Sequence, residues 1–184
     1  MRTIIAGLLG GLAMYVWATI AHLSPLAQIG IHTMPNDRIV VAALQLNLGK
    51  TAGVYIYPTP AVGGAMAPAA GAPKTQVAGM LSYDPAAPTA LSPRQLGTEF
   101  GLEIVESLLM AMIAALAAVG FGRRFGIAIL VGLIAGMATN LSYWNWWGFG
   151  LDYTLANGFI ELMKFVVAGL VIALLLGRKP KPAT

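Results

Sequence analysis

The chain has 184 residues, of which 58% are hydrophobic and only 10% carry a charge. Soluble globular domains carry about 25% charged residues, so this composition excludes an ordinary soluble protein. The chain has no cysteine, which excludes disulfide bonds, thiolate metal ligands and iron–sulfur clusters.

Four apolar stretches follow one another at residues 4–23, 101–121, 125–141 and 154–176. Each is close to the ~20 residues that cross a hydrocarbon core. The sequence therefore predicts an all-α integral membrane protein: a four-transmembrane-helix bundle with a small α+β extracytoplasmic domain inserted between helices 1 and 2. We expect transmembrane helices at 1–24, 93–121, 125–143 and 154–177, the extracytoplasmic domain at 25–92, an outer aromatic loop at 144–153 and a basic cytoplasmic tail at 178–184.

Basic residues gather at three places that share one side of the membrane if four helices are threaded in order. These residues are Arg2, Arg123, Arg124, Arg178, Lys179 and Lys181. By the positive-inside rule, both termini are cytoplasmic and loop 25–92 is periplasmic or extracellular. The net charge of +4 is then a topology signal with contacts to anionic lipid, and nucleic acid is not an expected partner. The bacterial inner membrane is the expected location.

The first apolar stretch has the basic start of a signal peptide but lacks a clear cleavage site, so we interpret it as an anchor helix. Gly7 and Gly11 share one face of this helix, and Gly132 and Gly136 share one face of the third. Small residues four apart allow close approach of helix backbones. We expect packing inside the bundle; the alternative is a docking face for another protein.

The inserted domain has one predicted helix and two predicted strands. Asn36 is the predicted cap of a helix at 37–47, and Gly49 is its terminator. Alternation of side chains predicts strands at 51–57 and 77–83, joined by a Pro-, Ala- and Gly-rich loop at 58–74 that we expect to be mobile. Because an isolated hairpin is marginal in water, we expect it to rest on the short helix, the membrane surface or a partner.

Ser92-Pro93-Arg94-Gln95 precedes the second apolar stretch and is a capping-box pattern that starts a helix at Pro93.

Aromatic residues follow the third apolar stretch. They predict an anchor at the outer membrane interface; the alternative is a lid or stacking wall for a lipid, quinone or pigment. The interface aromatics are Tyr143, Trp144, Trp146 and Trp147.

Polar residues within the spans need a partner or a purpose, because the bilayer penalises charge. Threading the helices brings seven of them to the outer half of the bundle: His22, Glu103, Glu106, Asn140, Asn157, Glu161 and Lys164. The simpler interpretation is a buried polar network that fixes helix register. The alternative is a site open to the outside that binds a metal, relays protons or holds a polar headgroup. No metal-ligand spacing supports the metal, and axial haem ligation by His22 and His32 is disfavoured by their different settings.

Catalytic signatures are missing from the sequence: there is no nucleophile elbow, phosphate-binding loop, His-Glu-x-x-His or dinucleotide fingerprint. We therefore expect no catalytic residues and no metal, and the sequence names no cofactor. The leading hypothesis is a non-enzymatic accessory, assembly or structural subunit of a larger membrane complex, with lipids and partner subunits or further copies of itself as partners. The alternative is a small transporter or membrane enzyme for a hydrophobic or ionic substrate, which would use the polar residues of the outer half.

Overall fold

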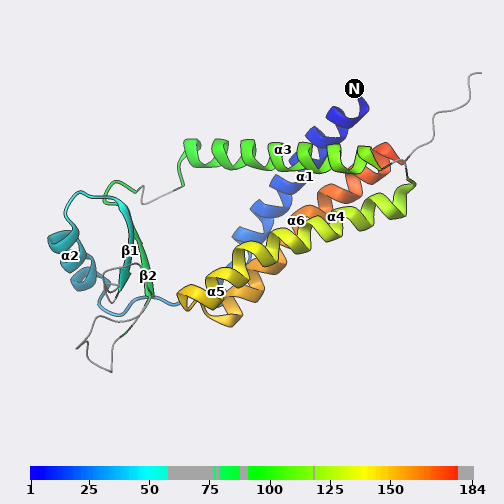
Figure 1. Cartoon of the computed structure of the whole chain (residues 1–184). Helices are drawn as coiled ribbons and strands as arrows, with labels where there is room; N and C mark the ends of the chain where they lie inside the picture. Colours follow the sequence, from blue (N-terminus) through cyan, green and yellow to red (C-terminus); the bar gives the residue numbers. More distant parts are fainter. Residues whose placement is uncertain (58–76, 78, 88–90, 118, 178–184) are drawn as a thin grey trace, which may run out of the picture.

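The protein is described here by a computed structural model, which covers residues 1–57, 77, 79–87, 91–117 and 119–177. It is mostly helical, with one small two-stranded sheet (Figure 1). The long helices are α1 (Arg2–Leu23), α3 (Pro93–Leu116), α4 (Phe121–Gly136) and α6 (Leu151–Leu176). The shorter elements are the 3₁₀ helix η1 (Pro25–Gln28), α2 (Asp37–Leu48), β1 (Gly53–Tyr57), β2 (Gly79–Tyr83), the π-helix η2 (Met137–Leu141) and α5 (Ser142–Trp147).

Three helical stretches are long and apolar enough to cross a membrane: Arg2–Leu23, Phe121–Trp147 and Leu151–Leu176. The chain is accordingly a membrane protein. The fourth long helix, α3, differs from these three because it carries Glu99, Glu103 and Glu106 before its last ten residues. Its role as a fourth span therefore depends on how those charges are accommodated.

Helix α6 lies in the middle of the bundle and packs against both α1 and α4, while α3 packs mainly on α1 (Figure 1). Met14, Met110 and Ile172 are buried at these contacts. Most of the other core residues are alanines, namely Ala6, Ala111, Ala114, Ala128 and Ala168. Small side chains suit helices packed in lipid, where close approach of backbones supplies the attraction.

The paired glycines lie at contacts between helices of this chain. A Cβ atom at Gly7 would lie 2.9 Å from Cα of Leu108, and one at Gly11 would lie 2.7 Å from Cα of Ile104. Both distances join α1 to the backbone of α3. In the same way Gly132 faces Phe165, with 2.8 Å to its Cβ, and Gly136 faces the carbonyl oxygen of Gly158 at 3.0 Å. These four glycines thus meet α3 and α6 of the same chain.

Two polar contacts tie helices together at the backbone level. The indole Nε1 of Trp17 in α1 donates to the carbonyl oxygen of Ile160 in α6 at 3.2 Å. At the opposite end of the bundle, Arg124 in the first turn of α4 donates to three carbonyl oxygens at the carboxyl ends of α3 and α6. Arg124 therefore has a structural contact in addition to the topology signal read from the sequence.

The start of α3 has both bonds of a capping box. The Ser92 hydroxyl accepts from the backbone N–H of Gln95 at 3.2 Å, and the Gln95 side chain accepts from the backbone N–H of Ser92 at 3.0 Å. This fixes the first residue of the helix and hence the face on which each later side chain lies.

The helical stretch that begins at Phe121 is longer than the predicted transmembrane range of 125–143. The π-helix η2 joins α4 to α5 without a break, so Trp144, Trp146 and Trp147 lie on a helix and not in the predicted loop 144–153. The helix ends where Gly148 adopts a left-handed conformation with φ of +72°. The side chains of Tyr143, Trp144 and Trp146 are exposed.

The inserted segment has the predicted helix followed by an antiparallel pair of strands. In the register of the hairpin, Tyr55 pairs with Leu81. Asn36 does not cap α2 through its side chain as predicted, because it adopts a left-handed conformation with φ of +56°. The strands are shorter than predicted, and the loop 58–74 lies outside the described residues. No residue of α2 is buried.

Candidate functional site

Four of the seven predicted polar residues meet around the ammonium group of Lys164. Its Nζ lies 2.7 Å from Oε1 of Glu103, 3.3 Å from Oε2 of Glu161 and 3.8 Å from Oε2 of Glu106. Glu103 and Glu106 come from α3, whereas Glu161 and Lys164 come from α6. We call Glu103, Glu106, Glu161 and Lys164 the Lys164 cluster.

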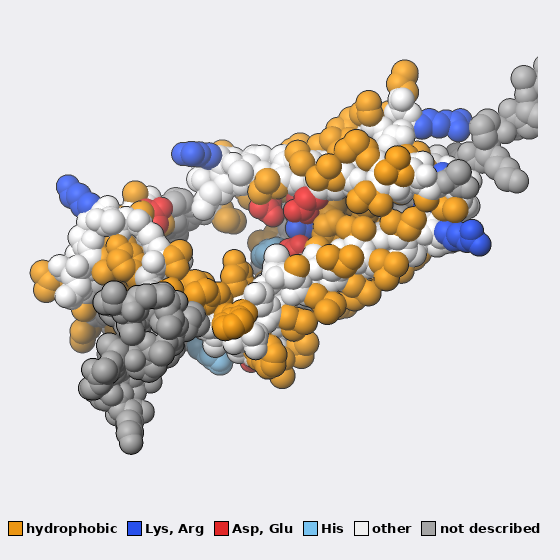
Figure 2. Space-filling view, in the orientation of Figure 1, with side chains coloured by type: hydrophobic (Ala, Val, Ile, Leu, Met, Phe, Trp, Pro, Cys, Tyr) orange, Lys and Arg blue, Asp and Glu red, His pale blue; other side chains and the backbone are white. Residues whose placement is uncertain are grey.

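The cluster is buried at its centre and open at its edge. The side chains of Glu103 and Lys164 are 1% and 6% exposed, while those of Glu161 and Glu106 are 32% and 41% exposed. Figure 2 shows acidic side chains gathering with a basic one in a hollow beside α3. The charges are thus turned toward one another and toward this hollow.

Helix spacing explains why these residues meet. Glu103 and Glu106 are three residues apart in α3, as are Glu161 and Lys164 in α6, so each pair lies on one helix face. The glycines of α1 bring α3 close: a Cβ at Gly11 would lie 3.0 Å from the carbonyl oxygen of Glu103. Glu103 is thereby held at the inner side of α3, where it reaches Lys164.

The other three predicted residues form hydrogen bonds to their own helices. His22 Nδ1 lies 2.8 Å from the carbonyl oxygen of Ala18. The amide of Asn140 donates to the carbonyl of Gly136 at 3.0 Å, and that of Asn157 donates to the carbonyl of Tyr153 at 3.0 Å. Their side chains therefore satisfy local backbone groups and not the Lys164 cluster.

Four buried oxygens near the centre of the cluster have no hydrogen-bond partner within the described ranges. Two of them, Oε1 of Glu103 and Oε2 of Glu106, lie within 4.0 Å of Lys164 Nζ in ion pairs. The other two, Oε2 of Glu103 and Oγ of Ser107, have neither kind of contact. Ser107 is completely buried and lies one helical turn after Glu103 on the same face of α3. Ser107 was not among the residues predicted from the sequence, although its spacing of four residues from Glu103 was the available signal.

The arrangement does not resemble a metal site. Within the part of the chain that the structure describes, no group of three or more His, Asp or Glu side chains could hold a metal ion. The ammonium group of Lys164 occupies the point on which the carboxylates converge. A metal ion would need that same point.

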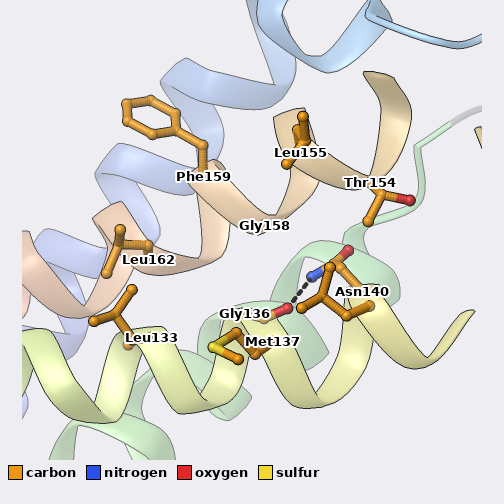
Figure 3. A pocket seen from close by; sticks show the side chains of 11 residues that line it. Leu133, Gly136, Met137, Asn140, Thr154, Leu155, Gly158, Phe159 and Leu162 are labelled. Carbon is orange, nitrogen blue, oxygen red and sulfur yellow. Dashed lines mark hydrogen bonds between the residues drawn. The ribbon is translucent and has the colours of Figure 1, made fainter. Parts of the chain in front are cut away.

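A separate groove lies between α4 with η2 and α6 (Figure 3). Its volume is about 250 Å³, and its lining is almost entirely apolar. Gly132, Gly136 and Gly158 contribute to its wall, with Asn140 and Thr154 at one end. The Asn140 amide is already bonded to the Gly136 carbonyl, and the Thr154 hydroxyl donates to the carbonyl of Gly150. The groove therefore resembles a lipid-facing surface more than a polar binding site.

The aromatic residues near this end pack on one another. Tyr143 stacks on Phe149 with ring centroids 5.5 Å apart, and Phe149 lies against Tyr153 at 5.4 Å. Trp144 and Trp146 are 44% and 60% exposed. Tryptophan side chains exposed at a helix end suit the headgroup level of a membrane.

Comparison of the chain with protein-family models, with curated proteins and with solved structures gives no match. Function is therefore inferred from the Lys164 cluster and from the surfaces of the chain itself.

Proposed function

We propose that this protein is a non-enzymatic accessory or assembly subunit of a larger membrane complex. In this proposal all four long helices span a bacterial inner membrane, both termini are cytoplasmic and residues 25–92 are periplasmic. The domain formed by α2, β1 and β2 would bind the partner outside the membrane.

The pairing of charges supports α3 as a fourth span. Its 24 residues give a length of about 36 Å at 1.5 Å per residue, which suffices for a hydrocarbon core of about 30 Å. Of its three glutamates, Glu103 and Glu106 face Lys164 of α6, whereas Glu99 is exposed nearer the start of the helix. A charge that is paired inside a bundle costs far less than one that faces lipid.

The position of the basic residues supports the proposed orientation. Arg124 binds the carboxyl ends of α3 and α6, so these ends meet at the start of α4. The sequence adds Arg123 at this point and three further basic residues after 177. An excess of arginine and lysine at one end of a bundle favours the cytoplasmic side for that end.

The observation that carries the proposed role is an exposed apolar stripe on α2. It consists of Ile39, Ala42, Ala43 and Leu46, all of which are exposed. Their spacing of three, four and seven residues places them on one face of the helix. Ile39 is 70% exposed and Leu46 is 86% exposed, so the stripe has no cover within the described part of this chain.

The chemistry of α2 favours a protein partner over a lipid surface. Helices that lie on membranes carry many basic residues on their polar face and large aromatic residues on the other. In contrast, α2 carries one basic residue, Arg38, balanced by Asp37, and it has no aromatic residue. A near-neutral aliphatic stripe is typical of a helix that packs in an apolar groove of another protein.

A pair of neighbouring substitutions tests this role. We expect Leu46→Glu to remove partner subunits from the protein when it is extracted in mild detergent and measured by native mass spectrometry, because a charge would enter the apolar contact. Gln45→Glu adds the same charge at an exposed position one residue away and should keep the partners. A wild-type protein that carries no other subunit would refute the accessory role, and equal loss in both variants would refute the role of the stripe.

The second candidate function is a small transporter or membrane enzyme for a hydrophobic or ionic substrate. The observation that favours it is the opening of Glu106 and Glu161 to the surface next to a buried ammonium group. Thermal stability of Glu106→Gln separates the two candidates. Stabilisation would indicate a charge retained for function, whereas destabilisation alone would indicate a structural network.

A further inference from the structure

The Lys164 cluster contains more negative than positive charge. Three carboxylates lie within 4.0 Å of a single ammonium group, which leaves two negative charges in excess when all four groups are ionised. The neighbouring elements place no second cation within 4.0 Å of these carboxylates among the described residues. Helix α3 adds Glu99 and, nine residues before Glu103, the exposed Arg94; α1 brings only His22 at this end, and His22 is bonded to the carbonyl of Ala18. Excess charge next to a buried core is unfavourable unless a further cation binds.

The buried carboxylate in this cluster has an oxygen free to take that cation. Glu103 is 1% exposed, and its Oε1 faces Lys164 Nζ at 2.7 Å. Its Oε2 has no hydrogen-bond partner within the described residues. A buried polar atom without a partner is costly, and bonding a proton to a carboxylate of the cluster would reduce this cost together with the excess charge.

The geometry selects a proton over a metal ion. A metal ion would have to displace Lys164 Nζ from the point where the carboxylates converge, whereas a proton needs no free volume. Glu106 and Glu161 offer the route, because they are partly exposed and each lies within 4.0 Å of Nζ. Carboxylates that share one ammonium group in this way titrate as a unit and not as separate residues.

We propose that the Lys164 cluster is a proton-binding site, which takes up a proton from bulk water through Glu106 and Glu161. The proton becomes bonded to a carboxylate oxygen, and the excess negative charge of the cluster falls by one. This site is a property of the contact between α3 and α6, and it does not depend on what α2 binds.

Proton uptake by the full-length protein in lipid nanodiscs tests the proposal. The pH is lowered from mildly alkaline to mildly acidic, and an indicator dye reports the protons taken up per protein. We expect the wild type to take up about one proton more than Glu106→Gln, because this variant removes one carboxylate from the coupled group. The control is Glu99→Gln, an exposed glutamate on the same helix, which should match the wild type. His22 and His32 are present in all three proteins, so a difference in uptake between the proteins does not come from the number of histidines.

Equal uptake by the wild type and Glu106→Gln would overturn the proposal, because proton uptake would then not depend on the coupled carboxylates that include Glu106. Infrared spectroscopy of the wild type decides the matter even if the variant does not fold: a protonated-carboxyl band at mildly acidic pH is expected, and its absence would overturn the assignment. Uptake that falls when choline chloride is replaced by sodium chloride would assign the site to sodium instead of the proton.

Discussion

Arg124 offers the sharpest test of how this bundle is held together. Its Nη1 donates to the carbonyl of Leu176 at 2.7 Å, its Nε to that of Ala114 at 3.0 Å and its Nη2 to that of Ala117 at 3.1 Å. These oxygens lie in or just after the last turns of α3 and α6, where carbonyl groups have no partner within the helix. One guanidinium group therefore satisfies the ends of two helices, and its positive charge complements both helix dipoles.

The expected cost of Arg124→Ala follows from these bonds. A hydrogen bond from a charged donor contributes about 1.5 to 3 kcal/mol, and three such bonds set an upper limit. Arg124 is only partly buried, so water can replace part of the loss after substitution. We therefore expect a decrease of about 2 to 4 kcal/mol in the free energy of unfolding.

Reversible unfolding in detergent measures this quantity, and the chain provides a matched control. Arg123 is exposed, adjacent and equally charged, so Arg123→Ala removes the same topology signal without the three bonds. It should change the free energy of unfolding by less than about 0.5 kcal/mol. Arg124→Lys keeps the charge but loses the planar guanidinium group, so its free energy of unfolding should lie between those of Arg124→Ala and Arg123→Ala. If both alanine variants were equally stable, Arg124 would act only through its charge, and the structural reasoning would be wrong.

Two further substitutions test the core of the bundle by the same unfolding measurement. Gly11→Ala would place a Cβ 2.7 Å from Cα of Ile104, so we expect the free energy of unfolding to fall by about 1 to 3 kcal/mol. The control is Gly126→Ala, whose Cβ would meet no atom within 4 Å and which should be neutral or stabilising by up to about 1 kcal/mol. A larger loss for Gly126→Ala than for Gly11→Ala would contradict the packing of α1 on α3. Lys164→Met leaves three carboxylates without their cation and should cost about 3 to 5 kcal/mol; a change below about 1 kcal/mol would show that the cluster is solvated like a surface ion pair.

Local patterns in the sequence predicted the elements whose causes are local. The capping box at Ser92 and Gln95 was readable because both partners lie within four residues. The glycine pairs predicted close packing for the same reason, since their spacing alone places them on one face. The identity of the facing residue, such as Ile104 for Gly11, was not readable, because it depends on which helices become neighbours.

The continuous helix to Trp147 shows where local patterns were insufficient. The aromatic residues at 143–147 favoured a loop at the interface, yet they lie on a helix that η2 extends from α4. A π-helix inserts one extra residue into a turn, and neither composition nor periodicity indicates where this happens. The contacts of Arg124 were hidden for a similar reason, because the carbonyl of Leu176 lies 52 residues away in the chain.

For the polar residues, the sequence predicted the level in the bundle at which they lie but not the partners that their side chains contact. Threading four helices through the membrane placed seven polar residues in the outer half of the bundle. The structure brings together the four charged ones, which are Lys164 and the three glutamates Glu103, Glu106 and Glu161. His22, Asn140 and Asn157 instead bond carbonyls four residues earlier on their own helices. Amide and imidazole side chains can form a hydrogen bond with a carbonyl of the preceding turn. A charged side chain inside the bundle needs an opposite charge, which Lys164 finds in Glu161 of the same helix and in Glu103 of α3.

The two basic residues Arg124 and Lys164 connect the same pair of helices at different heights. Arg124 binds the carboxyl ends of α3 and α6, and Lys164 binds the carboxylates of α3 from its position in α6. Between them, α3 packs mainly on α1 through the close contacts of Gly7 and Gly11. The two polar contacts therefore fix the direction of α3 relative to α6, while α1 fixes its distance. Because the Arg124 contact joins neutral carbonyls to one cation, it has no titratable partner; the Lys164 cluster has three. Any effect of protonation on the angle of α3 would consequently arise near the middle of α3 and α6, at the Lys164 cluster, and not at the end that Arg124 holds.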